Sequence, residues 1–210
     1  MTSRPGDSSD TPQSALLELA AQFHNSARTE IIDRIKQRDT ALFLYLAGAA
    51  TLFGLSSNSQ FRPVLYAIPL LGLGASQVFS QHSVVIGALG RYLGLESDQW
   101  LRKSFPHLSI PSQWDNSDSL LWMRNGGYMR PVYLSGLSLI VAPEALAVAV
   151  AATTIGNRSI LDALGIAAGV AAIALSYLSI HGAYRARKSY SLELRSYTQR
   201  LNNSPGDIEP

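Results

Sequence analysis

The chain has 210 residues, of which 47% are hydrophobic, 15% are charged and none is cysteine. A soluble globular domain carries about 25% charged residues, so this charged fraction is low. The lack of cysteine excludes disulfides, thiol catalysis, cysteine-based zinc sites and iron–sulfur clusters. The formal net charge of +2 indicates neither binding to duplex nucleic acid nor an acidic interaction tail.

Charged residues are almost absent from four long stretches of the chain. These stretches are residues 40–61, 63–90, 131–157 and 163–184, and the only charge inside them is Glu144. A helix needs roughly 20 apolar residues to cross a bilayer core of ~30 Å, so each stretch is long enough. Buried helices of a soluble protein are the alternative, but four of them would leave little amphipathic surface to cover them. Strands are disfavoured because the stretches do not alternate with a period of two.

We therefore predict an all-α, four-helix transmembrane protein with cytoplasmic helical extensions, assembled as a homo-oligomer in the lipid bilayer. The predicted parts are a disordered N-terminus at 1–13, a cytoplasmic amphipathic helix at 14–39, a membrane domain at 40–184, a cytoplasmic C-terminal helix at 185–203 and a disordered tail at 204–210. Within the membrane domain, the spans are predicted at about 40–57, 63–83, 132–154 and 162–184, with a cytoplasmic connection at 84–131.

The distribution of Lys and Arg predicts the orientation. The N-terminal arm, the connection at 84–131 and the C-terminal tail carry all of these residues except Arg62 and Arg158. The positive-inside rule therefore places both termini in the cytoplasm, in a multi-pass protein of the cytoplasmic membrane. The two outer loops are very short, so the functional surface is expected in the membrane or on its cytoplasmic side.

Three predicted helices extend beyond the membrane on the cytoplasmic side. The N-terminal helix meets no glycine or proline between Pro12 and Gly48, so it is expected to continue into the first span. The C-terminal helix carries a stripe with heptad spacing, formed by Tyr190, Leu194, Tyr197 and Leu201. These extensions either pack on one another or at the membrane surface, or they form a stalk that assembles subunits or docks a partner.

Glu144 is the first candidate for a functional residue, since a carboxylate inside a span is costly unless it faces water or a partner. It follows Pro143, which removes a backbone hydrogen bond. Three interpretations are open. Glu144 lines a pore as a ring of carboxylates, or it is protonated or hydrogen-bonded to a neighbouring helix, or its span is offset so that it lies near the outer interface.

His82 and His181 are the other ionisable candidates within the membrane, and each lies toward the cytoplasmic end of its span. A position among the lipid headgroups is favoured over a proton relay. The four histidines lie at positions 24, 82, 107 and 181, and none pairs with another at the spacing of a helical zinc site. No catalytic constellation is present, so the sequence predicts no enzyme, no metal site and no cofactor.

Small and basic residues supply the remaining candidates. Gly165 and Gly169 form a GxxxG pattern in the fourth span, and Gly72 and Gly74 lie in the second. Such residues permit close approach of helices, within one subunit or between subunits. Basic residues directly follow the fourth span, and they are candidate contacts for anionic lipids or for an anionic ligand such as an oligonucleotide. They are Arg185, Arg187 and Lys188.

Residues 34–40 (Arg-Ile-Lys-Gln-Arg-Asp-Thr) and 80–92 (Ser-Gln-His-Ser-Val-Val-Ile-Gly-Ala-Leu-Gly-Arg-Tyr) resemble segments of small bacterial four-span membrane proteins. The group is similar to the Hailong-type membrane effectors of anti-phage defence, and the resemblance covers roughly residues 30–200. It implies an oligomeric ion channel, kept closed or opened by an oligonucleotide that a cytoplasmic nucleotidyltransferase produces. A non-conducting scaffold that docks a soluble partner through its cytoplasmic helices is the alternative.

Overall fold

The computed structural model describes residues 12–106, 129–154 and 159–203. Its elements in chain order are α1 (Pro12–Ser56), the 3₁₀ helix η1 (Ser59–Tyr66), α2 (Ala67–Arg91), the π-helical turn η2 (Tyr92–Glu96), α3 (Ser97–Ser104), α5 (Met129–Thr154) and α6 (Ile160–Asn203). The predicted disordered ends and most of the predicted connection at 84–131 beyond α3 lie outside the described residues.

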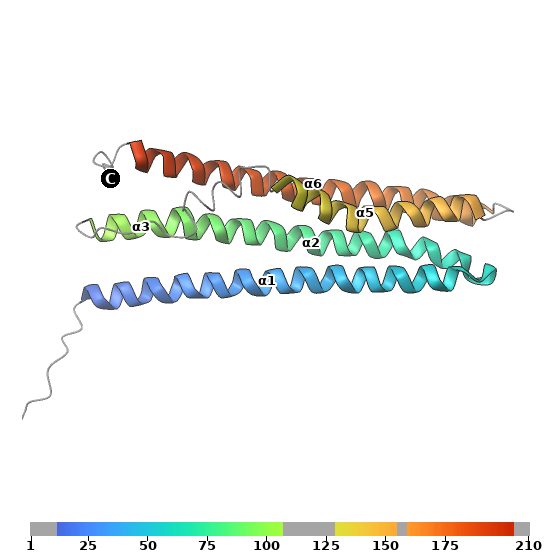
Figure 1. Cartoon of the computed structure of the whole chain (residues 1–210), viewed down its shortest axis with the longest axis horizontal. Coiled ribbons are helices and arrows are strands. Elements are labelled where there is room, and N and C mark those ends of the chain that lie inside the picture. Colours follow the sequence, from blue (N-terminus) through green and yellow to red (C-terminus); the bar gives the residue numbers. More distant parts are fainter. Residues whose placement is uncertain (1–11, 107–128, 155–158, 204–210) are drawn as a thin grey trace, which may run out of the picture.

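The helices form one elongated bundle in which α1, α2, α5 and α6 run alongside one another (Figure 1). All of the described elements are helical. Four helices, Ser14–Ser56, Ser59–Ser104, Tyr133–Thr153 and Ile160–Leu201, are long and apolar enough to cross a membrane. The protein is therefore an all-α multi-pass membrane protein, as the charge-free stretches predicted.

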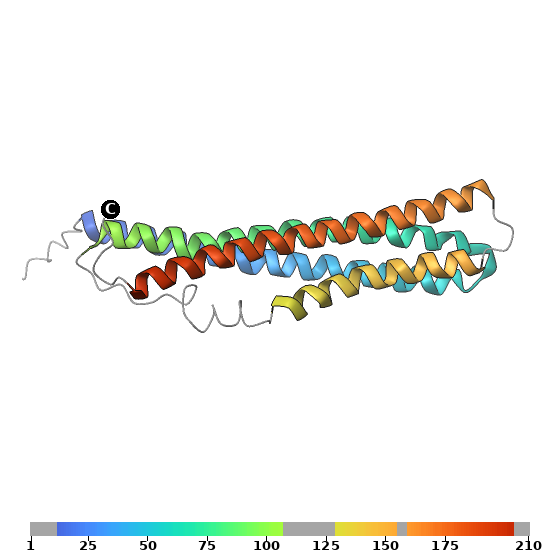
Figure 2. The same ribbon diagram turned by 90° about the horizontal axis from the view of Figure 1, so that it is seen from above.

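α1, α6 and the segment that continues from α2 into α3 extend well past the beginning of α5, at the end of the bundle where α6 ends (Figures 1 and 2). α1 has 45 residues and α6 has 44, against 26 in α5. At 1.5 Å per residue these lengths are about 68, 66 and 39 Å. We call residues 12–39, 84–104 and 185–203 the stalk, and residues 40–83, 129–154 and 159–184 the membrane domain.

α1 is continuous from the stalk into the membrane domain, as expected from the lack of an early glycine or proline. α6 is continuous in the same way. A helix without a break transmits movement along its axis, because its backbone hydrogen bonds resist bending. Two uninterrupted α-helices therefore connect the stalk to the membrane domain.

α2 lies between α1 and α6 in the bundle (Figure 1) and packs against α1, α5 and α6. The main apolar core surrounds it in the membrane domain and includes Tyr45, Ile68, Ile140 and Ile180, all of which are buried. The Tyr45 hydroxyl donates a hydrogen bond of 2.9 Å to the carbonyl oxygen of Ile140. This bond joins α1 to α5 and satisfies a polar group that has no access to water.

A second, smaller core lies at the end of the stalk, where Leu95, Leu194, Tyr197 and Leu201 pack together. The predicted N-terminal amphipathic helix is less well covered. Of its apolar residues, Ala27 is buried, whereas Leu19 and Phe23 keep 45% and 56% of their surface exposed. The stalk therefore has an internal core and also carries apolar surface that one chain does not cover.

Candidate functional site

Glu144 lies at the centre of the membrane domain and is completely buried. α5 continues as a helix through Pro143, and the Ser176 hydroxyl of α6 donates a hydrogen bond of 2.8 Å to Glu144 Oε1. Gly72 of α2 provides the space, since a Cβ atom there would lie 2.1 Å from Glu144 Oε1. The carboxyl group therefore joins three helices at one point.

This geometry bears on the three interpretations of Glu144. The residue lies ten positions before Thr154, the end of α5, or about 15 Å, which is half of a bilayer core of about 30 Å. The structure therefore does not support the third interpretation, in which Glu144 lies near the outer interface. Within one chain, Glu144 is hydrogen-bonded to a neighbouring helix, and in the described residues no cationic side chain pairs with it. The second interpretation fits best.

The two candidate histidines lie in different environments. His181 accepts or donates a hydrogen bond of 3.2 Å with the Tyr133 hydroxyl and stacks on Tyr177 at a centroid distance of 5.7 Å. Tyr184 packs on Tyr133 at 4.5 Å, which completes an aromatic cluster. His82 is buried on α2, and its Nδ1 has no hydrogen-bond partner in the described part of the chain. No described contact joins either histidine to Glu144.

The GxxxG pattern is used for packing inside the chain. A Cβ atom at Gly165 would lie 3.0 Å from the ring of Tyr66, and one at Gly169 would lie 2.7 Å from Val148 and 3.5 Å from Pro69. In α2, Gly72 is also closely packed, but a Cβ atom at Gly74 would meet nothing within 4 Å. Gly74 therefore makes no close contact within the single chain, because that side of α2 faces outward.

The basic residues after the fourth span point in different directions. Arg185 and Lys188 are exposed, whereas Arg187 is partly buried. The Arg187 side chain lies across Gly87 of α2, where a Cβ atom would approach its Cγ to 3.0 Å. The three residues therefore do not form one cluster, because successive positions of a helix point to different sides.

The C-terminal stripe also has a different role from assembly of subunits. Leu194 is fully buried and Tyr197 is 7% exposed, both packed on Leu95 of the same chain. The interpretation of the stripe as an oligomerisation surface is therefore corrected. The extensions pack on one another, which is the other arrangement that the sequence permitted.

The structure adds a polar site that sequence reasoning missed. Asp98 of α3 is completely buried, and its Oδ2 accepts hydrogen bonds from the Tyr197 hydroxyl (2.9 Å) and from Arg102 Nε (2.8 Å). Burial and the hydrogen bond to Asp98 raise the pKa of the Tyr197 hydroxyl above its usual range. The same carboxylate raises the pKa of Arg102. The i, i+4 spacing of Asp98 and Arg102 was visible in the sequence, but their burial was not.

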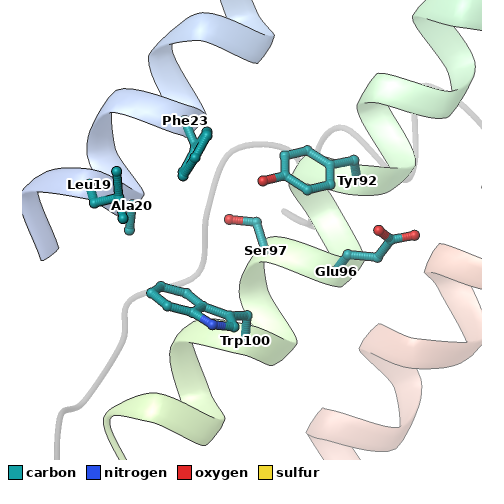
Figure 3. Close-up of a pocket in the computed structure, with 7 residues that line it drawn as sticks. All are labelled: Leu19, Ala20, Phe23, Tyr92, Glu96, Ser97 and Trp100. Atoms are coloured by element: carbon teal, nitrogen blue, oxygen red, sulfur yellow. The ribbon is translucent and has the colours of Figure 1, made fainter. Parts of the chain in front are cut away.

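An apolar groove separates α1 from the helical segment η2–α3 in the stalk (Figure 3). It has a volume of about 380 Å³ and is lined by Leu19, Ala20, Phe23, Tyr92, Glu96, Ser97 and Trp100. We call it the stalk groove. On the neighbouring side, Arg91 forms ion pairs with Glu96 and with Glu193 of α6. Aromatic rings and one acidic side chain therefore face outward from the stalk.

No protein-family model, curated protein or solved structure matches the chain. The class of protein is thus defined by the fold alone, as a helical multi-pass membrane protein with a three-helix stalk. The functional assignment depends on the chemistry of its surfaces.

Proposed function

We propose that the protein is a subunit of an oligomeric membrane effector that conducts ions and is gated from its stalk. The observation that carries this proposal is a polar face on the outside of the membrane domain. Its residues are Gly74, Gln77 and Gln81 of α2 with Ser179 and Gly182 of α6, and we call it the Gln77 face.

The Gln77 face is open and polar at a depth where lipid chains would surround a single subunit. Gln77 and Gln81 are exposed, and Gln77 has one hydrogen bond, 3.4 Å long, from Ser179. Gly74 and Gly182 have no atoms near a potential Cβ position. The two glutamines lie about 15 and 21 Å along α2 from its beginning, inside a bilayer core of about 30 Å. Hydrocarbon cannot satisfy amide groups, so another subunit or water is the better neighbour.

A conducting path fits better between subunits than through one of them. Around Glu144 the membrane domain is closed by side chains that are almost completely buried, including Ile68, Ile140 and Ile180. A path along the Gln77 face requires no opening of this core. The proposed pore is therefore lined by amide and hydroxyl groups, and Glu144 stabilises the wall behind it.

Control from the stalk follows from the continuity of α1 and α6 across both parts of the molecule. The resemblance to anti-phage effectors extends the proposal to its biological setting. In that setting a nucleotide signal from a cytoplasmic nucleotidyltransferase, or the enzyme itself, acts on the stalk and changes the conductance of the bacterial membrane.

Reconstitution of the purified protein tests the proposal. We expect a closed oligomer by mass measurement in detergent and ion currents in planar bilayers. Replacement of both glutamines (Gln77→Leu with Gln81→Leu) is expected to lower the conductance several-fold or to disrupt assembly, because apolar side chains exclude water and ions. The matched variant Glu144→Gln is expected to leave ion selectivity unchanged. A protein that stays monomeric and carries no current contradicts the proposal, and altered selectivity in Glu144→Gln would place that residue in the path.

A membrane scaffold that docks a soluble partner is the second candidate function, and the stalk groove favours it. Phe23 and Trp100 expose 56% and 42% of their surface there, outside the membrane domain. Exposed aromatic side chains of this kind are typical of protein interfaces. This function predicts that a partner co-purifies with the wild-type protein and is lost in Phe23→Ser, while Phe43→Ser, a change on the lipid-facing surface, retains it.

A further inference from the structure

Two arginines from helices far apart in the sequence line one small pocket at the junction of the membrane domain and the stalk. They are Arg38 of α1 and Arg187 of α6. The pocket is also lined by Phe79, Ser83, Tyr133 and Tyr184. We call this the Arg38–Arg187 pocket. It combines guanidinium and hydroxyl groups, which are the groups that bind phosphate in proteins.

Both arginine side chains are packed against their surroundings. Arg38 lies over the ring of Phe79 at 5.4 Å and donates hydrogen bonds of 3.0 and 2.8 Å to Asp39. Arg187 lies across Gly87, where a Cβ atom would be 3.0 Å from its Cγ. A site built from fixed side chains loses less conformational entropy on binding than one built from free lysines or arginines.

The balance of charge around the pocket is positive. His82, next to Ser83, interacts electrostatically with Arg34, Arg38 and Glu30. The acidic groups Glu30 and Asp39 each bond to one arginine, Arg34 and Arg38 respectively. His82 is 9% exposed, and its Nδ1 lacks a hydrogen-bond partner among the described residues.

The depth of the pocket matches the level of lipid phosphates. Arg38 lies about 27 Å from the end of α1 at Ser56, and Tyr133 about 32 Å from the end of α5 at Thr154. These distances coincide with the edge of a hydrocarbon core of about 30 Å. The aromatic cluster of Tyr133, His181 and Tyr184 lies at the same level, and such residues are typical of the membrane interface.

The size of the pocket restricts what can enter it. Its volume is about 30 Å³, which is space for roughly two water-sized groups. That space accommodates one or two oxygens of a phosphate and excludes a nucleobase or an acyl chain, which would remain outside.

We propose that the Arg38–Arg187 pocket binds a phosphate group, either from the headgroup of an anionic phospholipid or from a soluble phosphate compound. A bound phosphate would join α1 to α6 at the point where both helices leave the membrane domain. The proposal does not depend on ion conduction.

The lipid source is tested with the full chain in phosphatidylcholine nanodiscs with and without phosphatidylglycerol, by counting retained phosphatidylglycerol with native mass spectrometry. We expect Arg38→Gln and Arg187→Gln to lower retention about tenfold, a change typical of a lost charge-assisted hydrogen bond. The control Arg185→Gln removes the same charge two positions away from Arg187 and is expected to retain the lipid.

A second pair of variants separates position from charge. Gly87→Ala displaces the Arg187 side chain, together with the neighbouring Tyr190 ring, without removing the charge of Arg187, and is expected to lower retention as Arg187→Gln does. Gly182→Ala adds a methyl group to the same part of the bundle where nothing lies within 4 Å, and is expected to have no effect. Thermal unfolding of each variant confirms that it is folded.

The soluble source is tested with inorganic phosphate, measured as thermal stabilisation in phosphatidylcholine nanodiscs against chloride at equal ionic strength. Stabilisation of the wild type that Arg187→Gln lacks, without lipid retention, supports the pocket with a soluble ligand. Equal loss in Arg185→Gln and Arg187→Gln overturns the proposal, as does a wild type that neither retains phosphatidylglycerol nor responds to phosphate.

Discussion

In the membrane domain and at its junction with the stalk, two charged residues each lie opposite a glycine of α2. Glu144 of α5 lies against Gly72, and Arg187 of α6 lies across Gly87. A side chain at either glycine would occupy the volume that the charged group needs. The glycines therefore determine where polar groups sit between the helices, which is a more specific role than allowing helices to approach.

This role predicts that Gly72→Ala destabilises the protein. Alanine favours a helix over glycine by up to about 1 kcal/mol, but a Cβ atom 2.1 Å from Glu144 Oε1 requires a shift of buried atoms. Overpacking of this kind costs about 1–3 kcal/mol, so the clash outweighs the gain in helix propensity. Thermal unfolding in detergent is the measurement, and Gly74→Ala, with nothing within 4 Å, is the control that should unfold no earlier than the wild type.

A double substitution identifies the carboxyl group as the cause. In Gly72→Ala with Glu144→Ala, the added methyl group occupies space that the carboxyl group has left. The double variant is therefore expected to lose less stability than the two single variants lose together. Equal melting temperatures for Gly72→Ala and Gly74→Ala would contradict the packing of Glu144 described above.

At the scale of elements, α3 and α6 are joined at the end of the stalk by one polar contact surrounded by an apolar core. Asp98 receives hydrogen bonds from Tyr197 and Arg102, and Leu95 and Leu194 pack beside them. The π-helical turn η2 directly precedes α3. Turns of this kind are frequent at functional positions.

Loss of the Tyr197 hydroxyl is expected to loosen this contact. Tyr197→Phe removes one donor from the buried Asp98 carboxylate, at a cost of about 1–3 kcal/mol. Hydrogen exchange should therefore increase in the last turns of α6 and in α3, with little change in the membrane domain. Tyr190→Phe is the matched control, because no hydrogen bond of its hydroxyl is found in the described residues. An equal increase in both variants would show that the Asp98 contact contributes nothing.

The same contact predicts a dependence on alkaline pH. The pKa of Tyr197 is raised in the folded state by burial and by Asp98, so the neutral hydroxyl is favoured there. The stabilisation is fully present below pH ~10, the ordinary pKa of tyrosine, and is lost as the pH rises through the higher folded value. Stability at the stalk should fall in this range in the wild type more steeply than in Tyr197→Phe. Parallel curves for the two proteins would argue against this linkage.

At the scale of the whole molecule, the bundle has two different ends. One end holds η1 with the end of α5 and the beginning of α6, and the other holds the stalk (Figures 1 and 2). The positive-inside rule predicts that the stalk is cytoplasmic. The native chain contains no cysteine. A single introduced cysteine is therefore the only thiol of the protein that a maleimide can label.

Labelling of intact cells with a membrane-impermeant maleimide tests this topology. Gln60→Cys, in η1 at the end with short connections, is expected to react, because the reagent reaches the outer face directly. Gln22→Cys and Arg195→Cys, both exposed on the stalk, are expected to react only after the membrane is permeabilised. Labelling of the stalk positions in intact cells would reverse the predicted orientation.

Much of the architecture was predictable because it depends on local composition. The absence of charge over four stretches and the absence of helix-breaking residues before Gly48 are properties of consecutive residues. They predicted four membrane helices and a first helix that continues beyond the membrane. The C-terminal stripe was recognised on the same basis, but periodicity shows only that a face is apolar and not which surface covers it.

The sequence by itself therefore determined the all-helical class, the four helices long and apolar enough to cross a membrane, and the continuity of α1, because hydropathy and helix continuity are local. Only the tertiary structure decided which residues of different helices contact one another. It placed Glu144 against Gly72 and Ser176, buried Asp98 beneath Tyr197, and brought Arg38 and Arg187 to one pocket. These contacts join residues far apart in the chain, and they depend on the rotation of each helix about its axis, which a pattern along one helix does not specify.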